Sequence, residues 1–237
     1  MSLKVETKEK LKKVSTATIS TLLYKRGLKH QVIQDVHPIG IKDENMVGEA
    51  FTVRTIPGRE DLNDISVFRD PKHPQRVAVE TCPKGHIIVI DSRKDASCAS
   101  GGDILVSRMM MRGVAGVVSD GGFRDAMNIA KLDIHAYHNR PGTMTNLALH
   151  QTIDINVPIA CGNAPIYPGD IIVGDQDSVI VIPSNIADEI ADEAVPMNLY
   201  EDFVLDEVLK GSSIIGLYPQ TDDKYIKRFE DWKRNKR

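Results

Sequence analysis

The chain has 237 residues, 41% of them hydrophobic and 27% charged, which is the composition of a globular protein with one sizeable core. Its 30 Lys and Arg residues nearly balance 33 Asp and Glu residues, so the net charge of -3 gives no general attraction for nucleic acid or an anionic membrane. Three widely spaced cysteines predict neither a disulfide framework nor a zinc ribbon, and no apolar run approaches the roughly 20 residues that span a bilayer. The N-terminal residues are highly charged and do not resemble a signal peptide, so the expectation is a cytoplasmic protein.

The first half of the chain predicts a helical region and then strands. Residues 6–26 have a helical pattern, re-capped near Ser15 and ended by Gly27. Residues 48–55 alternate as a half-buried strand should, and a less regular segment with a short helix follows over residues 61–74.

The middle of the chain predicts a strand, a helix and a second strand with short connections. The strands are expected at residues 86–91 and 114–118, and the helix at residues 103–112, ended by Gly113. This order favours two parallel strands joined by a right-handed crossover.

The last third predicts mostly β-structure followed by helices. The expected strands cover residues 134–137, 153–157, 159–160, 168–175 and 179–183. Ser184 is expected to cap a helix over residues 186–194, and a second helix over residues 199–209 would reach Gly211. The basic residues 224–237 favour a solvated terminal helix over an RNA-binding tail. Without repeats or linkers, residues 1–237 are expected to form one domain, with a core over about 10–210 and a helical extension over about 211–237.

A glycine pair at the start of the central helix is the first candidate site. Gly101 and Gly102 precede Asp103, and the amides at the start of a helix have no partners within it. The amides of Ile104 and Leu105 could therefore hold a carboxylate, aided by the helix dipole. The alternative is a simple turn in which Asp103 only caps the helix.

A second polar cluster, Arg124 and Asp125, follows the second central strand. Ligands of open α/β sheets gather beyond the carboxyl ends of strands, where this segment would lie. An aspartate is a hard oxygen ligand for Mg²⁺ or Mn²⁺, and an arginine can stabilise a developing oxyanion. The alternative is an ion pair that only fixes the loop. Because the strand–helix–strand unit would bring the two clusters side by side, the two together favour a site.

Other candidate groups are weaker. His135 and His138 lie in a segment that alternates like a strand, so their rings would face opposite sides. Cys98 lies near the glycine pair with no obvious base, and we interpret it as a small buried residue. The sequence has no P-loop and no G-x-G-x-x-G motif that opens a βαβ unit, so nucleotide chemistry is not indicated.

Several of these motifs together resemble one family. Gly102-Asp103, followed after twenty residues by Arg124-Asp125, is similar to the signature of the RraA-like proteins, which include 4-hydroxy-4-methyl-2-oxoglutarate aldolases. The resemblance covers roughly residues 10–210 and extends to residues 15–18, 48–53, 112–118 and 157–175.

The resemblance implies a swivelling α/β/α-type sandwich with a central mixed β-sheet. It also implies assembly into homotrimers or hexamers with sites between subunits. In aldolases of this kind, the residue matching Asp125 binds the divalent metal, Mg²⁺ or Mn²⁺, largely through waters. The residue matching Arg124 contacts pyruvate and stabilises its enolate. The acid matching Asp103 helps orient the arginine and the waters, and the amides after it hold the substrate carboxylate.

The chain departs from the aldolase pattern at one position. That pattern has an acid three residues after the metal-binding aspartate, where this chain has Asn128. Asn128 can still hydrogen-bond a metal-bound water, but it removes one negative charge. A further acid from a neighbouring subunit's C-terminal helix is expected to contribute, and the candidate in this chain is Glu201.

The expected function is that of a divalent-metal-dependent aldolase that cleaves a 4-hydroxy-2-oxo acid to pyruvate through an enolate. The same enolate would allow oxaloacetate decarboxylation. The alternative is a non-catalytic protein that binds and inhibits a ribonuclease, as some RraA-like members do. The expected partners are a small 2-oxo acid and further copies of the chain, with neither nucleic acid nor a membrane.

Overall fold

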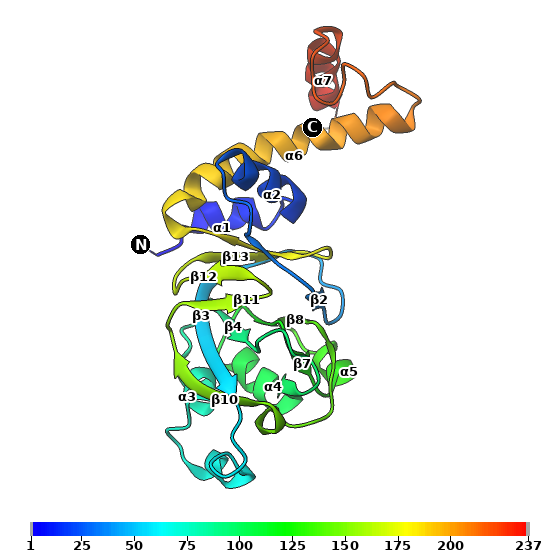
Figure 1. Cartoon of the computed structure of the whole chain (residues 1–237). Helices are drawn as coiled ribbons and strands as arrows, with labels where there is room; N and C mark the ends of the chain where they lie inside the picture. Colours follow the sequence, from blue (N-terminus) through cyan, green and yellow to red (C-terminus); the bar gives the residue numbers. More distant parts are fainter. Residues whose placement is uncertain (1, 236–237) are drawn as a thin grey trace.

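A curled, mixed β-sheet forms the centre of the computed structural model, which describes residues 2–235 (Figure 1). Among these residues the sheet has nine strands in the order β1-β14-β13-β3-β4-β6-β8-β2, and β10 pairs with β3. Their bounds are β1 (Val32–Ile33), β2 (His37–Pro38), β3 (Met46–Pro57), β4 (Ile87–Asp91), β6 (Gly116–Ser119), β8 (His135–His138), β10 (His150–Ile155), β13 (Ile171–Gly174) and β14 (Val179–Ile182). The mixed sheet and α/β class expected from the sequence are confirmed.

The middle of the sheet is parallel. β3, β4, β6 and β8 run in the same direction, and Ile87 of β4 lies opposite Gly116 of β6. This confirms the parallel pair predicted for the central strands. The remaining strands of the sheet pair antiparallel to their neighbours.

Two smaller sheets accompany the central one. β11 (Ile159–Cys161) and β12 (Ala164–Ile166) form an antiparallel hairpin. β5 (Ala99–Gly101), β7 (Gly122–Phe123) and β9 (Arg140–Pro141) form a short three-stranded parallel sheet. This last sheet joins the two ends of the segment in which the sequence predicts a site.

Most of the expected helices are present, but α3 and α5 were not predicted and the last long helix is undivided. Their bounds are α1 (Val5–Leu11), α2 (Thr16–Lys25), α3 (Pro74–Thr81), α4 (Asp103–Met111), α5 (Ala126–Ile129), α6 (Ala187–Leu209) and α7 (Lys224–Asn235), with 3₁₀ turns η1 (Ile65–Arg69), η2 (Asn146–Ala148) and η3 (Ser184–Ile186). The predicted re-capping is confirmed, because the Ser15 hydroxyl accepts from the backbone amide of Thr18, and Gly27 ends α2 at φ 82. No helix in residues 2–235 is both long and apolar enough to cross a membrane. Residues 236–237 of the expected terminal helix lie outside the described part.

The predicted division of the last long helix is wrong. α6 is a single helix of 23 residues that continues through Pro196, and Ser184 begins η3 instead of capping it. A proline inside a helix removes one hydrogen bond and crowds the preceding turn. Packing on both sides of Pro196 offsets this cost: Ile190 is buried against α1 and α2, and Phe203 is buried against α7.

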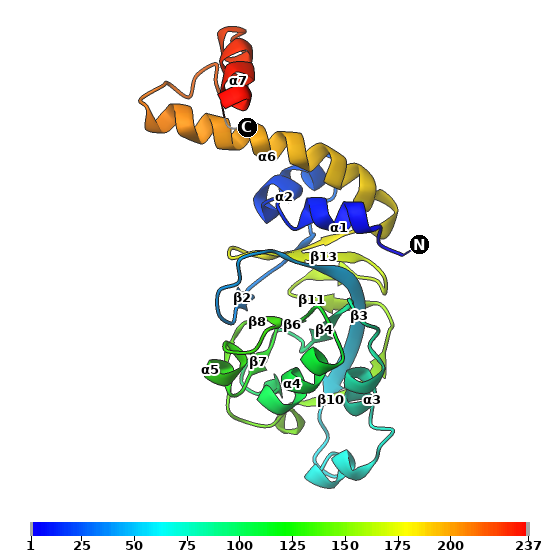
Figure 2. The same ribbon diagram turned by 180° about the vertical axis from the view of Figure 1, so that it is seen from behind.

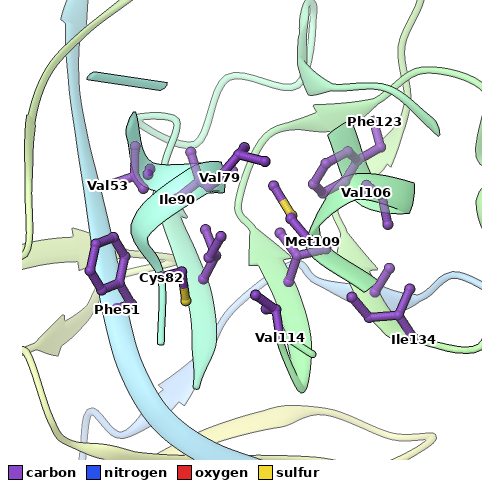
Figure 3. Packing of buried hydrophobic residues seen from close by; sticks show 14 of the residues in the cluster. Phe51, Val53, Val79, Cys82, Ile90, Val106, Met109, Val114, Phe123 and Ile134 are labelled. Atoms are coloured by element: carbon purple, nitrogen blue, oxygen red, sulfur yellow. The ribbon is translucent and has the colours of Figure 1, made fainter. Parts of the chain in front are cut away.

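Three buried clusters hold the sheet and its helices together. α1, α2 and the first part of α6 cover one face of the β13–β14 region, and α3, α4 and α5 lie around the parallel strands (Figure 1). The cluster under α3 and α4 includes Val79, Val106, Met109 and Phe123 (Figure 3). Phe123 is fully buried and immediately precedes Arg124, so this core fixes the backbone of the candidate site.

The end of α6 and α7 form an arm that extends away from the sheet (Figure 2). The arm has a small aromatic core of its own, in which Phe203 packs against Phe229 and Trp232 with ring centroids 5.3 and 5.8 Å away. The basic α7 is therefore held by apolar contacts to α6, as an amphipathic helix should be.

Candidate active site

The candidate site lies where α4 begins. Gly102 is the residue before α4, and the backbone amide of Arg124 donates to the carbonyl of Gly101 at 3.0 Å. β5 and β7 pair in parallel immediately before these residues. The structure therefore brings together the two segments that the sequence predicts to be neighbours.

The first amides of α4 have no partner within the helix. The first helical bond runs from the amide of Val106 to the carbonyl of Gly102, at 3.1 Å. The amides of Ile104 and Leu105 precede it, so they remain available to an anion at the positive end of the helix dipole.

Gly102 is required by a close approach of side chains. A Cβ at this position would lie 2.9 Å from both Arg124 Cγ and Asp125 Oδ2. Its backbone is extended, at φ -135 and ψ -177, so any residue could adopt it. A side chain at this position would therefore displace Arg124 and Asp125, although the backbone would accept it.

Arg124 and Asp125 form a loose, exposed pair. Arg124 Nε lies 3.3 Å from Asp125 Oδ2, and their side chains are 52% and 38% exposed. An exposed pair of this kind contributes little stability. Asp125 has a left-handed backbone, at φ 59 and ψ 31, which aspartate tolerates better than most residues. Both side chains are free to exchange their contact for a ligand.

Asp103 has a different partner from the one that the family resemblance implies. Its Oδ2 accepts from the side-chain amide of Asn128 at 2.9 Å, whereas Arg124 pairs with Asp125. In this structure Asp103 therefore orients Asn128, and it can hold the arginine only indirectly.

A cavity of about 290 Å³ contains most of the predicted site residues. Gly102, Asp103, Ile104, Leu105, Arg124 and Asp125 line it. Four further elements also line it, with Ile65 and Phe68 from η1, Gln75 and Arg76 from α3, Ala99 from β5, and Thr145 and Asn146 near η2. Of these, Gln75, Arg76 and Ala99 lie in no segment that the sequence pattern singled out. A signal for α3 was present, because Pro74 is a favoured first residue of a helix.

Glu201 lies apart from this cavity. It is on α6, where its carboxylate accepts from the hydroxyls of Thr18 and Tyr218. α6 and α4 are at opposite ends of the molecule in both views (Figures 1 and 2). Within one chain Glu201 therefore does not reach the candidate site.

A buried carboxylate, Asp120, precedes the candidate site in the chain. Asp120 is 1% exposed and accepts from the backbone amides of Ser92, Lys94 and Gly162. Burial raises the pKa of Asp120, and these amides oppose that rise. Because Asp120 ties three separate loops together, we interpret its role as structural.

Cys98 has a base beside it, contrary to the prediction. Its Sγ lies 3.2 Å from Nδ1 of His150, which is 52 residues away in the chain. Both residues are buried; burial raises the pKa of Cys98 to about 11 and lowers the pKa of His150. A neutral thiol is a poor nucleophile, so the interpretation of Cys98 as a small buried residue holds.

The carboxylates of the cavity fit some metals better than others. No group of three or more His, Cys, Asp and Glu side chains gathers into a metal site within residues 2–235. Mg²⁺ usually keeps several waters and binds through one or two carboxylates, and Asp103 and Asp125 line the same cavity. The two carboxylates therefore suit a hydrated Mg²⁺ or Mn²⁺, whereas zinc sites in proteins usually include histidine or cysteine ligands.

Comparison with known proteins identifies the family. A model of RraA-like domains, described as Aldolase/RraA, matches residues 16–181. The chain belongs to the RraA-like family. The RraA-like domain thus includes the whole candidate site, from Gly102 to Asn128.

The relatives of this RraA-like chain bear two kinds of name. A protein of Halalkalibacterium halodurans named "Putative 4-hydroxy-4-methyl-2-oxoglutarate aldolase" is 33% identical over 160 residues, which are 67% of this chain and 69% of that protein. Protein DlpA of Legionella pneumophila is 24% identical over 200 residues, which are 84% of this chain but only 31% of DlpA.

Solved structures share the fold. An uncharacterised protein of Pseudomonas syringae pv. tomato superposes with a TM-score of 0.76 at 21% identity, covering 92% of this chain and 99% of that one. Streptomyces coelicolor RraAS2, described as an unusual member of the RNase ES inhibitor RraA protein family, has a TM-score of 0.74 at 25% identity, covering 86% and 97%. The RraA-like fold is confirmed, and the names support an aldolase-like activity without specifying its metal or substrate.

Proposed function

We propose that this chain is a lyase that cleaves a 4-hydroxy-2-oxo acid and releases pyruvate with the help of Mg²⁺ or Mn²⁺. One observation carries the proposal: Arg124 and Asp125 lie against Gly102 at the start of α4, in a single cavity that Asp103 also lines. The aldolase names among the relatives agree with this chemistry.

The chain's own groups divide the binding of the 2-oxo acid between them. The free amides of Ile104 and Leu105 hold the carboxylate, since a helix start favours an anion. Arg124 contacts the neighbouring oxo oxygen and stabilises its negative charge as the C–C bond breaks. A guanidinium keeps its positive charge at any working pH, so this support does not depend on protonation.

Asp125 is the residue that would hold the divalent ion, with Asp103 and Asn128 orienting waters nearby. When bound, the ion supplies positive charge for the enolate that cleavage leaves behind. Release of carbon dioxide from oxaloacetate leaves the same enolate, so oxaloacetate decarboxylation is proposed as a side activity. Glu201 can contribute to this site only from a neighbouring copy of the chain whose α6 lies against the cavity. A homotrimer or hexamer could provide such a neighbour.

A pyruvate-coupled assay with lactate dehydrogenase and NADH tests the proposal. We expect turnover with Mg²⁺ or Mn²⁺, loss of turnover with EDTA, and a loss of kcat/KM of at least about 100-fold in Asp125→Asn. Asparagine tolerates the left-handed backbone, so this variant removes charge without strain. Asp35→Asn is the matched control, because Asp35 is an exposed aspartate with the same φ of 59 that does not line the cavity.

Two outcomes would overturn parts of this proposal. If Asp125→Asn were fully active in the presence of metal, the proposed role of Asp125 in metal binding would be wrong. If no metal-dependent pyruvate release were found with 4-hydroxy-2-oxo acids or oxaloacetate, the proposed lyase activity would be wrong. A second candidate function, binding to a ribonuclease, then takes its place, since the description of RraAS2 and the missing charge at Asn128 both favour it.

A further inference from the structure

Arg76 is a cation of the cavity wall that no acid in the described part of the chain neutralises. Within residues 2–235 its guanidinium makes no ion pair and no hydrogen bond, although it is half-buried and lines the same cavity as Arg124. The other arginine of the cavity, Arg124, is paired with Asp125. A half-buried and unpaired guanidinium is available to an anion that enters the cavity.

Aromatic packing orients the Arg76 side chain. Its guanidinium carbon lies 4.5 Å from the centroid of the Phe68 ring, close enough for a cation–π contact. The Phe68 ring in turn meets the buried His73 ring edge to face, with centroids 5.0 Å apart. A guanidinium stacked on a ring keeps the N–H donors along its edge free for a planar oxyanion. The stacking thus prepares Arg76 for binding at a reduced entropic cost.

The two arginines come from different parts of the chain around α4. Arg76 is on α3, and Arg124 immediately precedes the turn into α5. α4 contacts both helices, and α3 and α5 lie on opposite sides of it in both views (Figures 1 and 2). A ligand whose 2-oxo acid end sits at the start of α4 beside Arg124 therefore has a second cation available toward α3. Ile65 and Phe68 add apolar surface to the wall of the same cavity.

We propose that Arg76 binds a second carboxylate of the substrate, at the end remote from the 2-oxo group. The inference rests on the proposed lyase function and assigns, within this chain, the residue that recognises the distal carboxylate of a dicarboxylic substrate. Arg76 acts as a specificity-determining residue: it recognises the distal group and takes no part in the bond cleavage.

Paired substrates test this role. 4-Hydroxy-2-oxoglutarate carries the second carboxylate, and 4-hydroxy-2-oxopentanoate has a methyl group in its place. We expect Arg76→Gln to lower kcat/KM for the dicarboxylate by about 30-fold, mainly through KM, and to change that for the monocarboxylate by less than about twofold. Arg76→Lys keeps the charge and should recover part of the loss. Arg69→Gln removes the same charge from the neighbouring η1 without touching the cavity, and it should match wild type.

A binding experiment separates this inference from the proposed function. In calorimetry with Mg²⁺ present, Arg76→Gln should weaken the binding of 2-oxoglutarate by about 30-fold and leave the binding of pyruvate unchanged. If this pattern holds but neither hydroxy acid is cleaved, the lyase proposal fails and the second-carboxylate subsite stands. Equal losses for both ligands, no loss for either, or no binding of 2-oxoglutarate to wild type would overturn the role of Arg76. Circular dichroism and thermal unfolding of each variant confirm that the chain is folded.

Discussion

The side-chain amide of Asn128 donates to Asp103 across 2.9 Å and joins the short α5 to the start of α4. Where the aldolase pattern has an acid, this chain has a neutral hydrogen-bond donor. The pair is stable without a cation because no second negative charge faces Asp103 there. We expect this exchange of an acid for an amide to lower the affinity of the site for a divalent metal.

Replacing Asn128 by aspartate should reverse that exchange. In Asn128→Asp two carboxylates would meet at hydrogen-bond distance, so we expect a lower Tm without metal and about tenfold tighter Mg²⁺ binding. Thermal unfolding and calorimetry over a Mg²⁺ titration measure both effects. Asn128→Ala removes the same hydrogen bond without adding charge, and the same Mg²⁺ affinity in both variants would contradict this account.

A single methyl group at Gly102 should disable the site without unfolding the chain. Gly102→Ala would force Arg124 and Asp125 away, because its Cβ lies 2.9 Å from atoms of both, while the extended backbone accepts alanine. We expect kcat/KM to fall about 10- to 100-fold with little change in Tm. Gly101→Ala is the control: its Cβ comes no closer than 3.4 Å to its neighbours, an ordinary contact. Equal activity of the two variants would show that this approach is unimportant.

His138 should make the protein less stable in mild acid. Burial, with some help from nearby His37, lowers the pKa of His138 from 6.5 to about 4. In the unfolded chain His138 is protonated below about pH 6.5, whereas in the folded chain it stays neutral until about pH 4. The free energy of unfolding therefore falls as the pH falls through this window. The linkage corresponds to about 2 kcal/mol between pH 7.5 and 5.0.

Urea unfolding at those two pH values checks the His138 prediction. His138→Gln should lose about 2 kcal/mol less than wild type on acidification, whatever its stability at pH 7.5. His30→Gln, which alters an exposed histidine, should follow wild type. A pH dependence that His138→Gln leaves unchanged would assign the acid sensitivity to other groups.

We expect the three cysteine thiols to be unreactive in the folded protein. Cys82, Cys98 and Cys161 are all buried, and burial raises the pKa of Cys82 to about 12 and that of Cys98 to about 11. We expect a thiol reagent such as DTNB to react only as fast as the chain opens, and to reach three thiols per chain in denaturant. A fast phase in the native protein at neutral pH would show that one of the thiols is accessible.

The sequence was most informative where local pattern and tertiary structure agree. The strand predicted at residues 86–91 and the helix predicted at residues 103–112 became β4 and α4, because runs of buried Ile and Val and a clear glycine stop leave few alternatives. The juxtaposition of Gly102 and Arg124 followed from the same local unit.

The features that were missed depend on contacts between distant segments. The Cys98–His150 contact joins residues that are 52 positions apart in the sequence, and no local sequence pattern predicts it. α6 continues through Pro196 because helices elsewhere in the chain pack on both of its halves. Arg76 is notable only once α3 is placed beside α4, since an arginine in a short helix is unremarkable in the sequence.

The pairing of β5 with β7 brings the main groups of the candidate site together within one stretch of the chain. The bond from the Arg124 amide to the Gly101 carbonyl and the hydrogen bond from Asn128 to Asp103 are both made within one continuous stretch, residues 99–128. Phe123 anchors this stretch in the core beneath it. The relative placement of Gly102, Arg124 and Asp125 therefore depends mainly on contacts that are local in the sequence, while η1, α3 and η2 complete the cavity around them.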